Sequence, residues 1–184
     1  MKKTETDALP SKVVLLLAIA CGFAVANVYY AQPLLDTIGE TFNLDQAKVG
    51  IIVTISQIGY GMGLLLLVPL IDLINERKLI VGQFLLLGIF LLFIGFSSSL
   101  MIVLIGMFLV GSMAVVTQTL VAYAANLAAG STQGSVVGKV TSGVVIGLLL
   151  ARTVSGLIAQ LAGWRMVYIL SAMIIFIIGF FLYK

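Results

Sequence analysis

The stretch LLLARTVSG, residues 148–156, places the cation Arg152 inside a long apolar segment, with no acidic residue within a dozen positions on either side. A guanidinium stays charged at any physiological pH, so a nonpolar environment cannot neutralise it by removing a proton. A charge near the middle of a membrane helix costs roughly 2.5–3.5 kcal/mol. Arg152 is therefore predicted to face an interior that supplies water, hydrogen-bond acceptors or a bound anion.

Amide, phenol and hydroxyl side chains recur in the other apolar segments. Between residues 112 and 126, four polar residues share the approximate spacing of one helix face: Ser112, Thr119, Tyr123 and Asn126. Each polar group alone is explained by a hydrogen bond between helices, worth about 0.6 kcal/mol in a membrane. Spread over several helices, together they favour a cavity that contacts a small molecule. The candidate substrate-binding residues are Asn27, Tyr30, Gln57, Gln118, Tyr123 and Arg152.

The residue types that enzymes and metal sites need are scarce. The sequence has no histidine and a single cysteine, Cys21, so disulfide and metal frameworks are excluded. The apolar segments contain no pair of carboxylates and no serine or cysteine beside a base, as acid–base or nucleophilic catalysis requires. We predict no catalytic residue, no metal, no cofactor and no enzymatic activity. No basic cluster alternates with exposed aromatics, so a nucleic-acid partner is not expected.

Composition places these residues in a membrane protein. Charged residues make up 9% of the chain and hydrophobic residues 61%, whereas roughly 25% of residues are charged in a typical soluble domain. An apolar run of about 20 residues spans the hydrocarbon core as a helix. The sequence predicts an all-α membrane protein, with a tail at residues 1–12 and one domain at 13–184. Its six helices are expected at about 13–35, 48–70, 79–97, 100–124, 139–161 and 165–183.

The distribution of lysine and arginine predicts the orientation, because positively charged loops remain on the cytoplasmic side. With a cytoplasmic N-terminus, the outer side carries Lys48 and Arg165. The inner side then carries Lys2, Lys3, Lys12, Arg77, Lys78, Lys139 and Lys184. Both termini are therefore predicted to be cytoplasmic. A cleavable signal peptide ending near residues 24–26 is the alternative, although the apolar stretch continues beyond it through VYYAQPLL.

The six segments divide into two sets of three with matched character, which suggests an inverted repeat of three helices plus three. The second and fifth segments are rich in glycine, and the third and sixth are long aliphatic and aromatic runs. In the fifth, small residues at steps of four form a ridge for close helix packing: Gly143, Gly147, Ala151, Ser155 and Ala159. This ridge either packs helices within the chain or slides against a partner.

The loop after the second segment carries a family resemblance. The stretch GLLLLVPLIDLINERKLIV resembles the signature loop of the major facilitator superfamily, with Leu70, Asp72 and Arg77 as matches and Lys78 continuing its basic end. ANVYYAQPLL, SQIGYGMGLLLLVPL and SGVVIGLLLARTVSGLIAQLAGWR resemble bacterial drug-exporter-like members of this superfamily. The resemblance covers about residues 13–183. It implies the N-terminal six-helix half of a transporter in a bacterial inner membrane, which alternates access around a midplane site.

The resemblance implies a role for the loop residues and a partner half, while the residues themselves leave alternatives open for Arg152 and for proton coupling. Asp72 would latch the two halves in the outward-facing state, and Arg77 would face anionic lipid or that carboxylate. Arg152 would bind an anionic substrate group, pair with a carboxylate from the missing half, or organise a hydrated cluster. Proton coupling would use Asp36 in an outward-open cavity or a residue of the absent half. Expected partners are a small-molecule substrate, membrane lipids, and a missing C-terminal half or a second copy in a homodimer.

Two functions compete. The first is proton-coupled efflux of small amphipathic or drug-like compounds, a substrate class that rests on the resemblance. The second is a truncated or split membrane fragment or scaffold that does not transport and needs a partner half, because a six-helix half exposes the surface meant for that partner.

Overall fold

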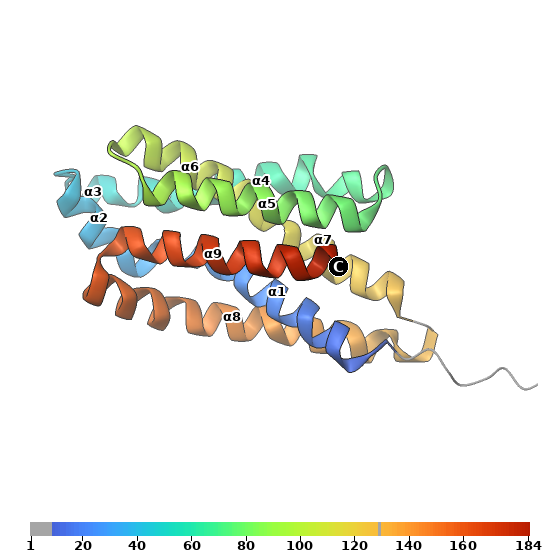
Figure 1. Cartoon of the computed structure of the whole chain (residues 1–184). Coiled ribbons are helices and arrows are strands. Elements are labelled where there is room, and N and C mark those ends of the chain that lie inside the picture. The colour runs from blue at the N-terminus through green and yellow to red at the C-terminus, as the bar shows by residue number, and fades with distance from the viewer. Residues whose placement is uncertain (1–8, 129) are drawn as a thin grey trace, which may run out of the picture.

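The computed structural model describes residues 9–128 and 130–184, and it is helical almost throughout (Figure 1). Six helical segments in this part of the chain are long and apolar enough to cross a membrane. They run over Ser11–Thr41, Ala47–Asp72, Glu76–Gly95, Leu100–Leu127, Gly130–Ala162 and Trp164–Tyr183. The expected six-helix, all-α architecture is confirmed.

Several of the six segments are built from shorter pieces. The α-helices are α1 (Ser11–Tyr29), α2 (Leu35–Thr41), α3 (Gln46–Val49), α4 (Ile51–Leu66), α5 (Glu76–Gly95), α6 (Leu100–Ala114), α7 (Val116–Leu127), α8 (Gln133–Ala162) and α9 (Trp164–Tyr183). The 3-10 segments are η1 (Gln32–Leu34), η2 (Val68–Asp72) and η3 (Gly130–Thr132). The helical segments extend beyond the apolar runs at several ends: α8 begins at Gln133, before the run expected at residue 139. The apolar run marks the hydrocarbon core, whereas a helix can continue into the polar headgroup region.

Local residue chemistry explains where the helices bend, begin and end. Pro33 and Pro69 lie in the first positions of η1 and η2, where proline's missing N–H is tolerated. Asn75 caps α5, because its side-chain oxygen accepts a hydrogen bond from the Lys78 amide at 3.2 Å. Gly163 separates α8 from α9 with φ of +84°, a backbone angle that favours glycine. These residues mark the positions at which the helices bend, begin or end.

The bundle is organised in three pairs of neighbouring helices: α1 with α8, α4 with α6, and α5 with α9. An inverted repeat would superimpose the first three crossings on the last three, that is α1 on α6, α4 on α8 and α5 on α9. The pair α1–α8 would then superimpose on the pair α6–α4, and the pair α5–α9 on itself. This is the arrangement expected of an inverted repeat. Figure 1 shows α5, α9 and α8 lying alongside one another, with α1 passing behind α9 and emerging between α9 and α8.

Glycines bring the paired helices into close contact. A Cβ added to Gly143 would overlap the backbone carbonyl of Ala18, and one added to Gly147 would overlap Gly22. In the related pair, a Cβ on Gly59 would overlap the Phe108 carbonyl. The small-residue ridge of α8 therefore packs against α1 within the chain. Further along this ridge, Ala151 is 2% exposed and Ser155 is fully buried.

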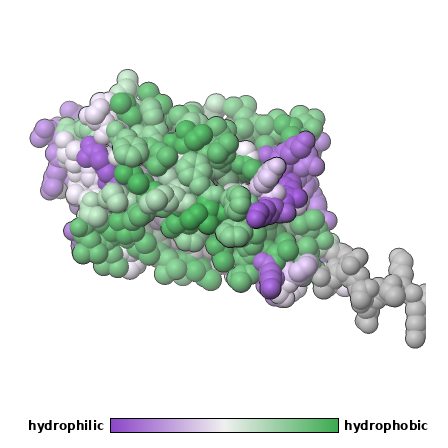
Figure 2. Space-filling model, in the orientation of Figure 1, coloured by the Kyte–Doolittle hydropathy of each residue, from purple (hydrophilic) through white to green (hydrophobic). Residues whose placement is uncertain are grey.

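The outer surface matches a membrane environment. Figure 2 shows apolar side chains over the middle of the visible face and hydrophilic ones gathered towards both ends. The start of α1, the connections before α5 and α8, and the end of α9 lie at the same end of the bundle in Figure 1. We call this the N-terminal end. Its described cations are Lys12, Arg77, Lys78, Lys139 and Lys184, against Lys48 and Arg165 at the opposite end.

Candidate functional site

A polar contact at the surface of the bundle joins α4 and α7. Gln118 Nε2 donates a hydrogen bond to the Tyr60 hydroxyl at 3.1 Å. Gln118 is exposed and Tyr60 is half-buried. Gln57 is also exposed and precedes Tyr60 by three residues, so the two lie on one side of α4. Hydrocarbon offers no hydrogen bonds to exposed amides, so this face is suited to contact water, solute or protein.

Arg152 is exposed on α8. Its neighbours on the ridge, Ala151 and Ser155, are buried against the bundle, and one residue along an α-helix turns the side chain by about 100°. Within the described residues, the Arg152 guanidinium makes no hydrogen bond or ion pair. The structure therefore places this charge at the surface of the six-helix unit, where a further partner is needed to stabilise it. We refer to Gln57, Tyr60, Gln118 and Arg152 as the polar face residues, a name for these partly or fully exposed polar side chains of α4, α7 and α8.

Asn27 and Tyr30 lie elsewhere, in the contact between α1 and α9. Asn27 is 1% exposed, and its Oδ1 accepts a hydrogen bond from Ser171 Oγ at 2.7 Å. Its Nδ2 donates to the Phe23 carbonyl at 2.7 Å. Tyr30 is 6% exposed and is therefore also buried in the bundle. The structure thus uses these side chains to join helices, and it does not bring them to the polar face residues.

Tyr123 is half-buried on α7 and packs against the apolar core. Ser112, expected on the same polar side, is buried instead and donates to the Gly59 carbonyl at 3.0 Å. The Phe108 carbonyl lies 2.9 Å from the same hydroxyl and shares or alternates as the acceptor of its single proton. Its hydroxyl therefore joins α6 to α4. Gln118, on the α7 part of the same membrane crossing, is exposed instead.

Asp72 and Arg77 of the signature loop lie at the N-terminal end of the bundle, and both are exposed. Arg77 does not pair with Asp72. Its Nε donates to the Leu182 carbonyl at 3.1 Å and its Nη2 to the Tyr183 carbonyl at 2.6 Å. A cation is favourable there, because the last carbonyls of a helix lack intrahelical partners and carry partial negative charge. Within the described residues, Asp72 forms no ion pair, so its carboxylate is free to meet a group from outside them.

Polar contacts at the start of α9, which the sequence did not predict, connect this helix to α2 and to Ser97. Trp164 Nε1 donates to Thr41 Oγ1 at 3.1 Å. The Arg165 guanidinium lies 4.4 Å from the Trp164 ring centroid and donates to the Ser97 carbonyl. The pair Trp-Arg after a glycine was the available signal, since both side chains favour the membrane interface. Among the described residues, no three of His, Cys, Asp and Glu gather as a metal site would require.

The fold and the polar face residues define a class: a multi-pass membrane bundle built as two sets of three helices, with partly or fully exposed polar side chains on α4, α7 and α8. The sequence matches the Major Facilitator Superfamily over residues 15–184. The chain belongs to this superfamily, as a six-helix half that corresponds to the N-terminal one.

Curated relatives agree with that assignment. The chain is 45% identical over 184 residues, its full length, to the uncharacterized transporter YgaY of Escherichia coli O157:H7, and covers 46% of that protein. It is 33% identical over 164 residues, 89% of the chain, to a protein of Streptomyces coelicolor that is named as a transporter, and covers 38% of it. The chain thus spans about half the length of the curated relatives it matches, or less. Membership of a transporter family is consistent with a protein that is not an enzyme.

Proposed function

We propose that the chain forms one half of a transporter that moves small solutes by alternating access, with the polar face residues lining the solute path. The observation that carries this proposal is Arg152. It is a permanent cation exposed on a membrane-crossing helix, with no partner among the described residues. Leaving it in lipid costs roughly 2.5–3.5 kcal/mol. A second six-helix unit that covers this face and encloses water with the solute would remove that cost.

The chemistry of the face bears on what it binds. Gln118 and Tyr60 offer one amide and one phenol that are already hydrogen-bonded to each other, and Gln57 adds a second exposed amide. These groups donate and accept hydrogen bonds, while Arg152 attracts an anion. Export of small amphipathic compounds that carry a polar or anionic group fits this mixture. Arg152 contacts either the anionic group of the solute or a carboxylate of the covering unit.

Proton coupling would draw on carboxylates outside the middle of the membrane. Asp36 is exposed on α2, at the end of the bundle opposite the N-terminal end, and Asp72 ends η2 at the N-terminal end. Among the described residues, neither carboxylate forms an ion pair with Arg152. The proton-carrying acid is therefore Asp36, exposed to an outward-open cavity, or a residue of the covering unit.

The N-terminal end of the bundle is proposed to be cytoplasmic, in a bacterial inner membrane. Five described cations lie at this end against two at the other, the bias that retains loops in the cytoplasm. At this end, Asp72 is proposed to act as a latch by pairing with a cation of the covering unit. Arg77 is proposed to support this latch by hydrogen-bonding the end of α9 to the start of α5.

The competing function is a membrane fragment or scaffold that does not transport, because a six-helix unit without a covering unit would leave Arg152 exposed and would not enclose a solute path. Native mass spectrometry of the purified chain in a mild detergent separates the two functions. A homodimer, or a co-purified second six-helix chain, is expected if the polar face is covered. Parallel halves related by an axis along the membrane normal make a homodimer geometrically possible. A stable monomer with no copurifying partner would contradict the transporter function for this chain as isolated.

A further inference from the structure

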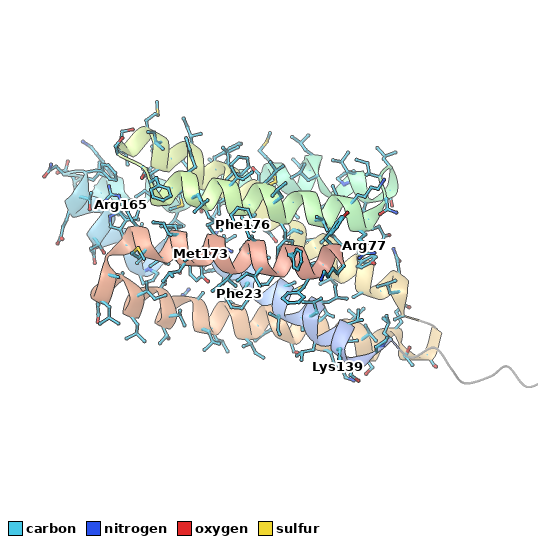
Figure 3. The ribbon with its side chains drawn as sticks, in the orientation of Figure 1. Phe23, Arg77, Lys139, Arg165, Met173 and Phe176 are labelled. Atoms are coloured by element: carbon cyan, nitrogen blue, oxygen red, sulfur yellow. The ribbon has the colours of Figure 1, made fainter. Side chains whose placement is uncertain are left out.

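A long groove follows the contact between α1 and α8 and reaches Ile174 of α9. It has a volume of about 910 Å³. Phe23 belongs to its lining and lies between the ribbons of α8 and α9 in Figure 3. Most of its wall is aliphatic, including Leu15, Ile19, Ile146, Leu150 and Val154. All five of these side chains are exposed, so the groove is open at the surface of the six-helix unit.

The groove is separate from the polar face. Arg152, Gln118 and Gln57 do not line it. Gly22 and Gly147 lie along it where α1 and α8 touch backbone to backbone, so the two helices leave no gap at that position. A solute path that uses the polar face therefore leaves this groove without a role.

One end of the groove is polar and positively charged. Ser11, Ser135, Lys139 and Ser142 line it where α1 begins and α8 has completed its first turns. Lys139 is exposed and precedes Ser142 and Gly143 by three and four residues, so its stem lies in line with the groove wall. Lys12, also exposed, is next to Ser11. The groove lining contains no acidic residue.

We propose that this groove binds an anionic phospholipid, with an acyl chain along the apolar wall and the phosphate at Lys139. The lining residues of α1 run from Ser11 to Tyr30, which spans about 28 Å of helix. One leaflet contributes about half of a hydrocarbon core of roughly 30 Å, so one acyl chain fits within the groove's length. The long stem of Lys139 can lie on apolar surface while its ammonium reaches the headgroup level.

The charge pattern favours this occupant over others. A zwitterionic lipid would fill the apolar wall equally well but would leave the Lys139 ammonium without a net anionic partner. A second copy of the chain would bring its own exposed lysines to the same end. An anionic phospholipid satisfies both the apolar wall and the cationic end, and it is present at this depth of the membrane.

Native mass spectrometry of the chain in detergent tests the proposal with two lipids that share acyl chains, phosphatidylglycerol and phosphatidylethanolamine. Wild type is expected to retain phosphatidylglycerol preferentially. Lys139→Gln should reduce that retention about fivefold, the effect of removing one cation near anionic headgroups, and leave phosphatidylethanolamine unchanged. Lys78→Gln is the matched control, because Lys78 is an exposed cation at the same end outside the groove.

Two results would overturn the proposal. Equal retention by wild type and Lys139→Gln would remove the phosphate contact, and equal losses in Lys139→Gln and Lys78→Gln would reduce it to general surface attraction. Dihexanoyl-phosphatidylglycerol supplies the headgroup with short chains. It should displace the long-chain lipid poorly, and efficient displacement would show that the apolar wall contributes nothing.

Discussion

Replacing Gly147 with alanine is expected to destabilise the bundle by about 2–3 kcal/mol, within the range for overpacking a tight core. The new methyl group would overlap backbone atoms of Gly22 on α1. Backbone cannot rotate away as a flexible side chain can, so α1 and α8 would have to separate along their contact. The midpoint of thermal unfolding of the purified chain in detergent measures the change.

Gly138→Ala provides the matched control for this prediction. Gly138 lies on the same helix, and an added Cβ would meet no atom within 4 Å. Alanine is favoured over glycine in a helix by about 1 kcal/mol, so Gly138→Ala should leave the midpoint unchanged or raise it. Similar midpoints for the two variants would mean that α1 and α8 are not in backbone contact at Gly147.

Replacing Arg152 with leucine is expected to have opposite effects on membrane insertion and on transport. In the chain alone, the substitution removes a charge from an exposed membrane position and should favour insertion of α8 by about 3 kcal/mol. A glycosylation-reporter assay of α8 insertion measures this gain. In the assembled transporter the same substitution should abolish solute flux, because Arg152 is proposed to hold an anionic group.

Charge-conserving replacement separates the roles of Arg152. Arg152→Lys keeps the positive charge and should weaken flux less than Arg152→Gln, which keeps only hydrogen-bonding capacity. Equal loss in both would count against a simple charge role and favour a guanidinium-specific arrangement. Unchanged insertion in Arg152→Leu would contradict the placement of Arg152 within the hydrocarbon core.

The fold was largely predictable from the sequence because membrane crossings have a strong one-dimensional signal. A run of about 20 apolar residues predicts a crossing whatever lies next to it, and all six crossings occur where such runs were found. The helix ends were less predictable. Polar residues such as Gln133 continue α8 outside the hydrocarbon, where hydropathy no longer distinguishes helix from loop.

The side to which each polar residue points was not predictable from spacing. Asn27 and Gln118 are both amides in apolar segments, yet Asn27 bonds to Ser171, 144 residues away, while Gln118 is exposed. Helix periodicity places residues on a shared side but does not say whether that side meets another helix or the outside. In a soluble helix, apolar residues mark the buried side, whereas in a membrane both sides are apolar.

Arg77 illustrates the same limit for charged groups. The spacing of the signature loop suggested a partner in Asp72 or in lipid, and the structure places the guanidinium on the last carbonyls of α9. That contact joins residues 105 and 106 positions apart. The contact depends on α5 and α9 packing side by side. The sequence predicted two long apolar helices but not that they would be neighbours.

Access of water to the polar face is the central claim, and thiol labelling tests it most directly. Cys21 is the single cysteine of the sequence and is buried, so Cys21→Ala gives a clean background. In membranes of cells that make the chain, Gln118→Cys should react with a charged, water-soluble thiol reagent, because the reactive thiolate forms in water. Ile177→Cys, at an exposed apolar position of α9, should stay unmodified. Failure of Gln118→Cys to react, as at Ile177, would show that the face meets lipid or dry protein, and no solute path would pass along it.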